Sequence, residues 1–97
     1  MIAQLNECDW VQLNDLVRQK STSVEDKTVR FLELQSGFEE TQWCYKGHIG
    51  YIISGRMEIQ FEHETKTFEA GEAMVLPAAI AHKAKAASKV TLFLVDV

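Results

Sequence analysis

Three side chains of the sequence could together hold a metal ion. Cys44 and His48 stand four residues apart just before an apolar run, and His82 follows after Gly71, Pro77 and an alanine-rich segment. Thiolate and imidazole are both good ligands for a borderline-soft divalent metal. In a small barrel, a segment as far along the chain as His82 can fold back onto the same cavity. The sequence therefore indicates a candidate metal site.

Each of these side chains also has a simpler interpretation when it is taken alone. An unpaired cysteine is most often a small buried hydrophobe. A lone His48 or His82 is more often a hydrogen-bonded or surface histidine. We expect His63, which lies in a charged turn, to be solvated, and we assign no function to Cys8 in the polar N-terminal segment. The metal hypothesis depends on three candidates meeting at one place.

The elements that must position these residues are predicted to be short strands. From Thr28 onward, β-branched and aromatic residues are dense and glycine stands at the gaps, which is typical of strands joined by tight turns. The predicted strands are residues 28–35, 41–45, 48–54, 56–62, 65–69, 73–76, 81–86 and 90–97. Ser54 and Gly55 predict a tight hairpin, because glycine accepts a positive φ. Many short strands predict a sandwich or a barrel.

The clearest strand signal lies in residues 56–62. Met57, Ile59 and Phe61 alternate there with polar and charged residues. Successive side chains of a strand point to opposite faces, so one face is apolar and the other is solvated. This period of two predicts an antiparallel sheet with one face in water.

The first 27 residues are more polar than the rest and are predicted to form an N-terminal extension to a barrel of residues 28–97. Asp9 could cap a short helix there. Apolar residues recur at helical spacing in this segment: Trp10, Leu13, Leu16 and Val17. The alternation from Trp10 to Leu13 also fits a strand, and we favour the helix. The polar residues 20–27 are expected to form a loop.

Composition and charge exclude several classes of protein. The 97 residues make one domain, and hydrophobic and charged fractions of 46% and 25% are those of a globular protein. The net charge of -4 and the lack of a basic stripe argue against nucleic acid as a partner. No apolar run approaches the ~20 residues of a membrane span, and no signal peptide is apparent. We expect a cytoplasmic protein, no membrane contact, and two cysteines that are free thiols.

The segment from Gln42 to His82 resembles the two motifs of the cupin superfamily. The first family motif reads His-x-His, three or four residues, Glu, six residues, Gly. The second reads Gly, five residues, Pro-x-Gly, two residues, His. Aligned on Gly55, the sequence has Gln42, Cys44 and His48 where the first motif has its two histidines and its glutamate. The first motif is therefore heavily altered.

The second motif is a close match to residues 71–82. Aligned on Gly71 and Pro77, His82 takes the place of the motif's histidine, and Ala79 stands where the family usually has glycine. The resemblance covers residues 28–97. It implies an all-β protein with the cupin jelly-roll β-barrel, a double-stranded β-helix.

The resemblance also implies where a metal would be held. Gln42 and Cys44 are two residues apart on a predicted strand, so they would face one side, which is the barrel interior in the resembling proteins. A set of Cys44, His48 and His82, with Gln42 or water in the fourth position, would resemble catalytic zinc sites. Zinc or nickel is expected in preference to iron, since the family's glutamate is missing and an iron-bound thiolate is vulnerable to oxidation.

The residues around the site are expected to divide between an inner and an outer face. The core and pocket wall are predicted to contain Ile52, Met57, Ile59, Phe61, Val75 and Phe93. Alternation favours an outward position for Trp43, Tyr45 and Tyr51, whereas a bulge would turn them into the pocket. Residues 90–95 are apolar on both faces, which suits a strand covered on both sides. Cupins frequently dimerise through such sheets, so the resemblance predicts a homodimer.

The leading hypothesis is a small cupin that binds a divalent metal and holds a small polar ligand in the barrel. If it catalyses a reaction, non-redox Lewis-acid chemistry of the isomerase or lyase type fits the soft ligands better than a dioxygenase reaction. One alternative is a metal-free binding or sensor module in which Cys44 and His48 are polar groups of the pocket. Another is a structural dimerisation barrel. No Gly-x-Ser-x-Gly elbow or glycine-rich phosphate loop occurs.

Overall fold

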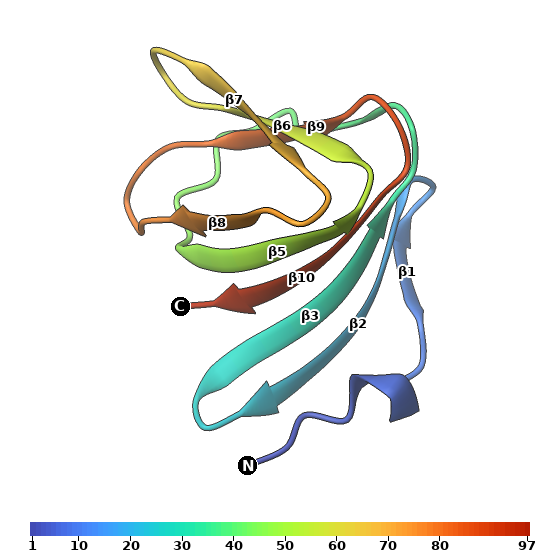
Figure 1. Ribbon diagram of the computed structural model, residues 1–97. Helices are drawn as coiled ribbons and strands as arrows, with labels where there is room; N and C mark the ends of the chain where they lie inside the picture. The colour runs from blue at the N-terminus through green and yellow to red at the C-terminus, as the bar shows by residue number, and fades with distance from the viewer.

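The computed structural model describes residues 1–97, and strands make up most of it (Figure 1). The elements are η1 (Leu5–Glu7, a 3-10 turn), β1 (Val11–Asn14), β2 (Val17–Val24), β3 (Lys27–Leu34), β4 (Phe38–Glu39), β5 (His48–Ser54), β6 (Arg56–Gln60), β7 (Thr65–Glu69), β8 (Ala73–Leu76), β9 (Lys83–Ala86) and β10 (Val90–Asp96). One sheet has the order β1-β2-β3-β10-β5-β8 and the other β4-β9-β6-β7. All strand pairs are antiparallel. No helix has the length and apolar character needed to cross a bilayer.

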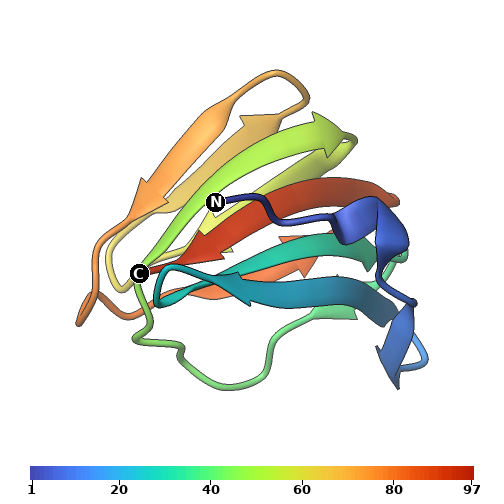
Figure 2. The ribbon, with the colours of Figure 1, turned by 90° about the horizontal axis from the view of Figure 1, so that it is seen from below.

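The hydrophobic core lies between the two sheets. Figure 2 shows β5, β10, β3 and β2 side by side in the larger sheet. Along β10 the inward residues Val90, Leu92 and Leu94 are buried, while Phe93 and Val95 on the other face are half-buried. The core cluster draws on both sheets and consists of Val17, Leu32, Leu34, Ile52, Met57, Ile59, Met74, Leu76, Ala86, Val90, Leu92 and Leu94. Burying a side chain of this size contributes about 1.5–3 kcal/mol, so this cluster stabilises the packing of the two sheets. The strands and their antiparallel pairing confirm the predicted all-β fold.

Most of the predicted strands are confirmed. β5, β7 and β8 have the predicted bounds, β3 is shifted by one residue at each end, and β6, β9 and β10 differ by one or two residues at one end. The strand predicted at residues 41–45 is wrong. Only Cys44 of that segment forms a bridge, to His82, so the rest of it is a loop that no neighbouring strand holds extended.

The helix and the loop predicted in the first 27 residues are also wrong. β1 pairs with β2, and β2 pairs with β3 from Val17 to Val24. Glu25 and Asp26 join β2 to β3 and both have a positive φ, 49° and 66°, as the tightest hairpin turns require. Strand pairing with β3 therefore overrides the weak helical spacing. The division of the chain at residue 27 stays a prediction.

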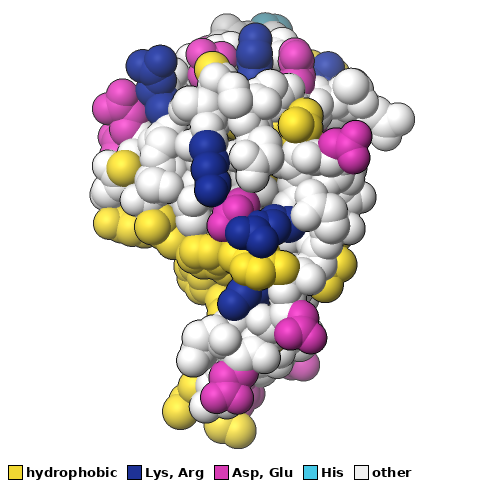
Figure 3. Space-filling view, turned by 90° about the vertical axis from the view of Figure 1, so that its right-hand side faces the viewer, with side chains coloured by type: hydrophobic (Ala, Val, Ile, Leu, Met, Phe, Trp, Pro, Cys, Tyr) yellow, Lys and Arg dark blue, Asp and Glu magenta, His cyan; other side chains and the backbone are white.

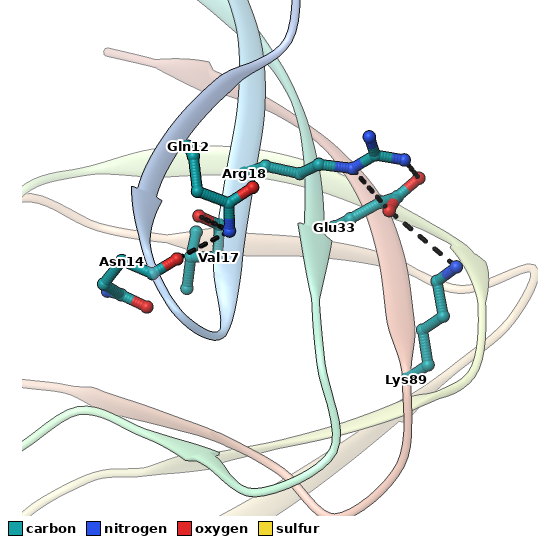
Figure 4. A network of polar contacts seen from close by, with 6 residues as sticks. All are labelled: Gln12, Asn14, Val17, Arg18, Glu33 and Lys89. Atoms are coloured by element: carbon teal, nitrogen blue, oxygen red, sulfur yellow. Dashed lines mark hydrogen bonds and ion pairs between the residues drawn. The ribbon is translucent and has the colours of Figure 1, made fainter.

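A polar and aromatic layer covers the outer face of β2 and β3. Trp10 packs on Phe31 with ring centroids 5.6 Å apart, and the Arg18 guanidinium lies 4.0 Å from the Trp10 centroid. Arg18 donates two hydrogen bonds to Glu33, of 2.9 and 3.1 Å, which lower the pKa of Glu33, and Lys89 lies 3.8 Å from that carboxylate (Figure 4). Figure 3 shows hydrophobic side chains across the middle of the β1 side of the molecule, with basic side chains lying over them.

The loop between β8 and β9 contains a strained residue. Ala79 has a φ of 69°, a left-handed conformation that costs a non-glycine residue about 1–2 kcal/mol. Its amide donates a 2.9 Å hydrogen bond to the Tyr45 carbonyl, which holds the loop in this conformation. The strain lies where the cupin motif usually has glycine.

We expect Ala79→Gly to raise the free energy of unfolding by about 0.5–1 kcal/mol, because the relieved strain exceeds the entropy that glycine adds to the unfolded chain. Urea denaturation measures this change. Ala78→Gly is the matched control, since Ala78 has no positive φ, and it should lower the free energy of unfolding. Equal effects of the two substitutions would contradict the strain at Ala79.

Candidate metal centre

The structure brings Cys44, His48 and His82 together. One ligand atom from each side chain lies within 4.8 Å of the other two. His48 and His82 are only 7% and 3% exposed, and Cys44 is half-buried. Buried polar groups need partners, so the arrangement of the two imidazoles decides what the group can bind.

Backbone pairing positions Cys44 beside His82. The Cys44 N–H donates to the His82 carbonyl at 2.8 Å, and the His82 N–H donates to the Cys44 carbonyl at 2.9 Å. His48 is the first residue of β5, where the alternation that buries Gly50 and Ile52 also turns it inward. Segments some 40 residues apart in sequence therefore meet because a two-way backbone bridge joins them.

Both imidazoles are oriented through Nδ1. His48 Nδ1 lies 2.8 Å from Asp96 Oδ1, and Asp96 is the residue of β10 that pairs with His48 in register. His82 Nδ1 lies 3.2 Å from the Ile80 carbonyl oxygen. A carboxylate and a carbonyl only accept hydrogen bonds, so each Nδ1 carries the proton and each Nε2 keeps a free lone pair. Metal-binding histidines in proteins have this arrangement.

The protonation state of His48 also suits a metal. Burial lowers the pKa of His48, and the hydrogen bond to Asp96 offsets this effect only in part. His48 is therefore neutral at pH 7, as a ligand must be. In a tetrahedral zinc site with bonds of about 2.0–2.3 Å, ligand atoms lie about 3.5 Å apart. The three side chains fit such an ion after inward shifts of about 1 Å, given their separations of up to 4.8 Å.

We expect Asp96→Asn to weaken zinc binding by about 10- to 100-fold, because the substitution removes the carboxylate that orients His48 and raises its basicity. A chelator competition titration measures the affinity. Asp9→Asn, at an exposed position in the N-terminal segment, is the control and should leave the affinity unchanged. An unchanged affinity in folded Asp96→Asn protein would show that Asp96 does not act on the site.

The cavity beside these three residues has a volume of about 240 Å³. Thirteen of its 18 lining residues are hydrophobic, and they include Met57 and Ile59. Cys44, His48 and His82 also line it, together with two charged residues, Arg30 and Glu40. The metal-ligand candidates therefore adjoin an apolar space that is large enough for a small organic molecule.

The other four residues predicted for the core and pocket wall do not line this cavity. Ile52 is fully buried in the core, and Phe61 packs against the core, half-buried. The place predicted for Phe93 in the core and pocket wall is wrong, because it lies half-buried on the outer face of β10, between the inward residues Leu92 and Leu94. The core position predicted for Val75 is wrong, because this side chain is 69% exposed. Val75 alternates with the buried Met74 and Leu76, so it points away from the barrel.

Gln42 and the three aromatic residues lie outside the cavity. Gln42 is exposed, because the strand that was expected to turn it inward beside Cys44 is not formed. Its role as a fourth ligand stays a prediction. Tyr45 and Tyr51 are 58% and 47% exposed. Lys83 Nζ lies over the Trp43 ring, 4.4 Å from the ring centroid. The outward position of Tyr45 and Tyr51 is confirmed, and that of the half-buried Trp43 stays a prediction.

Sequence reasoning missed Arg30, Glu40 and Asp96. A signal for two of them is present, since Arg30 shares the inner face of β3 with Leu32 and Leu34, and Asp96 shares that of β10 with Leu92 and Leu94. Charged residues in register with a core stripe are candidates for a polar site. No comparable signal marks Glu40, whose Oε1 accepts a 2.8 Å hydrogen bond from the Ala84 amide.

Two facing antiparallel sheets, an apolar interior and a group of inward metal-ligand candidates define a small β-barrel with a candidate metal site. The family model for the cupin domain matches residues 25–97, and the chain belongs to the cupin family. The comparison with curated protein sequences gave no match.

Solved structures with the same fold share little sequence with this chain. KdgF from Halomonas sp. is 23% identical with a TM-score of 0.76, over 94% of this chain and 87% of that one. Ectoine synthase from P. lautus is 19% identical with a TM-score of 0.80, over 99% and 76% of the two chains. An RmlC-like cupin from Shewanella frigidimarina is 11% identical with a TM-score of 0.82, over 98% and 87%. These similarities establish the fold.

Proposed function

We propose that this cupin binds a divalent metal through Cys44, His48 and His82 and holds a small ligand in the adjoining cavity. The observation that carries the proposal is the shared arrangement of the two histidines. Each has its Nδ1 proton bound to an acceptor, at 2.8 Å for His48 and 3.2 Å for His82. Each therefore keeps the lone pair of Nε2 free for a metal, and one potential ligand atom from each of the two imidazoles and the thiol lies within 4.8 Å of the others.

The donor set favours zinc or nickel over iron. One sulfur and two imidazole nitrogens suit a borderline-soft ion, and three protein ligands leave a position open for a ligand or water. Such a metal supplies Lewis-acid polarisation of a carbonyl oxygen without a redox step. If the protein is an enzyme, this chemistry fits an isomerase or lyase better than a dioxygenase.

Elemental analysis of tag-free protein tests the proposal. The expected result is about one zinc or nickel per chain, or tight uptake of about one equivalent on titration of the metal-free protein. Protein without metal that also takes up none would overturn the proposal. It would favour a metal-free binding module, to which the mostly apolar lining of the cavity is equally suited. A thermal-shift screen of small acids and sugars would then identify ligands.

We also propose a homodimer formed through the outer face of the larger sheet. Ile49, Tyr51, Ile53 and Val75 are 44–69% exposed there. Ile49 pairs with Val75 of β8 and with Val95 of β10, so these side chains form one continuous apolar strip. Exposed apolar strips of this kind mark protein–protein interfaces. Size-exclusion chromatography with light scattering should give twice the mass of the 11.0 kDa chain.

Ile49→Lys is expected to convert the dimer to a folded monomer, because it places a charge within the apolar strip. The mass of the variant in solution measures this change. Val11→Lys is the control, since Val11 is similarly exposed, at 54%, but lies on the edge strand β1. Dissociation by Val11→Lys, or a wild-type monomer at all concentrations, would contradict the proposed interface.

We propose a cytoplasmic location on chemical grounds. Cys8 and Cys44 are both free thiols, and a cysteine that serves as a metal ligand must stay reduced. A reducing compartment meets this requirement.

A further inference from the structure

Arg30 places a positive charge on the wall of the same cavity. It lies on β3, with Leu32 and Leu34 following it on the inner face, and it lines the cavity together with His48 and His82. Its side chain is only 22% exposed. A half-buried guanidinium beside an apolar space requires partners for its five N–H donors.

Arg30 has fewer hydrogen-bond partners than its donors require. Its Nη2 donates a 2.8 Å hydrogen bond to Asp96 Oδ1, the same oxygen that lies 2.8 Å from His48 Nδ1. Its Nε is buried and has no hydrogen-bond partner. A buried donor without a partner costs about 1–3 kcal/mol, so the guanidinium would gain free energy by turning toward an acceptor, which a ligand in the adjoining cavity can supply.

A second arginine of the same sheet makes the paired contact with a carboxylate that Arg30 lacks. Arg18 lies on the outer face of β2, and both its Nε and its Nη2 donate to the carboxylate of Glu33, at 2.9 and 3.1 Å (Figure 4). Paired N–H donors of this kind match the two oxygens of a carboxylate. Arg30 has the Nη2 contact to a carboxylate and lacks the Nε contact.

Glu40, the other charged residue of the cavity wall, is not the missing partner of Arg30 Nε. Its Oε1 accepts a hydrogen bond from the Ala84 amide on β9, in the other sheet. The cavity thus joins a guanidinium, a group of metal-ligand candidates and a mostly apolar wall.

We infer that Arg30 binds the carboxylate of a small ligand whose apolar part occupies the cavity. The inference rests on the proposed function, because it names the class of ligand for the same cavity. The volume of about 240 Å³ equals about eight water molecules at ~30 Å³ each, which fits a short-chain carboxylate. Inorganic anions lack the apolar part that the wall would contact.

Titrations of zinc-loaded protein with butanoate, followed by ¹H–¹⁵N chemical-shift changes, test the inference. Butanamide and 1-butanol serve as neutral probes of similar size, and inorganic phosphate serves as an anion without an apolar part. Arg30→Lys keeps a positive charge beside Asp96 but loses the planar set of donors. Arg18→Lys makes the same change on the outer face and is the matched control.

The expected result is saturable butanoate binding that Arg30→Lys weakens about tenfold or more and Arg18→Lys leaves unchanged. Equal binding of butanamide or phosphate, equal binding by Arg30→Lys, or no binding of butanoate would each overturn the inference. Zinc titration of the same variants without butanoate tests the proposed function separately. Arg30→Lys protein that binds zinc normally shows that any loss of butanoate binding arises at Arg30.

Discussion

Replacing Cys44 with serine is expected to lower the affinity for zinc by at least about 100-fold, more than the loss of a partner that only orients a ligand. The serine hydroxyl stays neutral at pH 7 and cannot replace a thiolate. The barrel should stay folded, because the bridge to His82 is made by backbone atoms, at 2.8 and 2.9 Å. Chelator competition measures the zinc affinity, and circular dichroism checks the fold.

The second cysteine of the chain provides the control for this experiment. Cys8 is a free thiol in the N-terminal segment, where its Sγ donates only a 3.6 Å hydrogen bond to the Gln4 carbonyl. Cys8→Ser should bind zinc as the wild type does. Full zinc occupancy in Cys44→Ser protein would show that the thiol is not a ligand, and a loss in both variants would point to a site other than this one.

Gly55→Ala is expected to lower the free energy of unfolding by about 3–5 kcal/mol, a large part of the stability of a small domain. Gly55 joins β5 to β6 with a φ of 85°, which is strained for alanine. An added Cβ would lie 2.2 Å from the Lys89 carbonyl oxygen and 3.0 Å from Val90 Cα. Both atoms are backbone, so relief requires moving the start of β10, and urea denaturation measures the cost.

Gly71→Ala separates the cost of the positive φ from the cost of the steric clash with Lys89 and Val90. Gly71 has a similar φ of 91°, but nothing lies within 4 Å of an added Cβ. This variant should therefore lose only the conformational cost, about 1–2 kcal/mol. Equal losses in the two variants would show that the contact with Lys89 does not contribute.

The sequence predicted the parts of the fold that depend on local patterns. The alternation of Met57 and Ile59 with polar residues identified β6 and its buried face, and Gly55 identified the hairpin before it. The alternation from Trp10 to Leu13 had offered a strand where β1 lies, as the alternative to the favoured helix, and β2 escaped prediction because its signal is weak. Glu25 and Asp26 form a two-residue turn without the usual glycine, and β2 becomes a strand through its pairing with β3.

The candidate site, too, could be predicted where it depends on local sequence patterns and not where it depends on contacts between distant segments. Cys44, His48 and His82 could be selected from residue type and from positions in two sequence motifs, and the structure places them within 4.8 Å of one another. Gln42 could not be placed correctly, because its orientation depended on an extended strand. With only the Cys44 bridge to hold it, that segment forms a loop and Gln42 faces solvent.

By itself, the sequence predicted an antiparallel all-β fold, since side-chain period and turn glycines are local properties, and its resemblance to the cupin motifs predicted the barrel and the three metal-ligand candidates. Only the tertiary structure decided that Asp96 orients His48 and that Arg30 lines the cavity. Those contacts depend on β10 lying between β3 and β5 in one register. Strand order and register are set by packing across the whole barrel, and a pattern within one strand does not contain them.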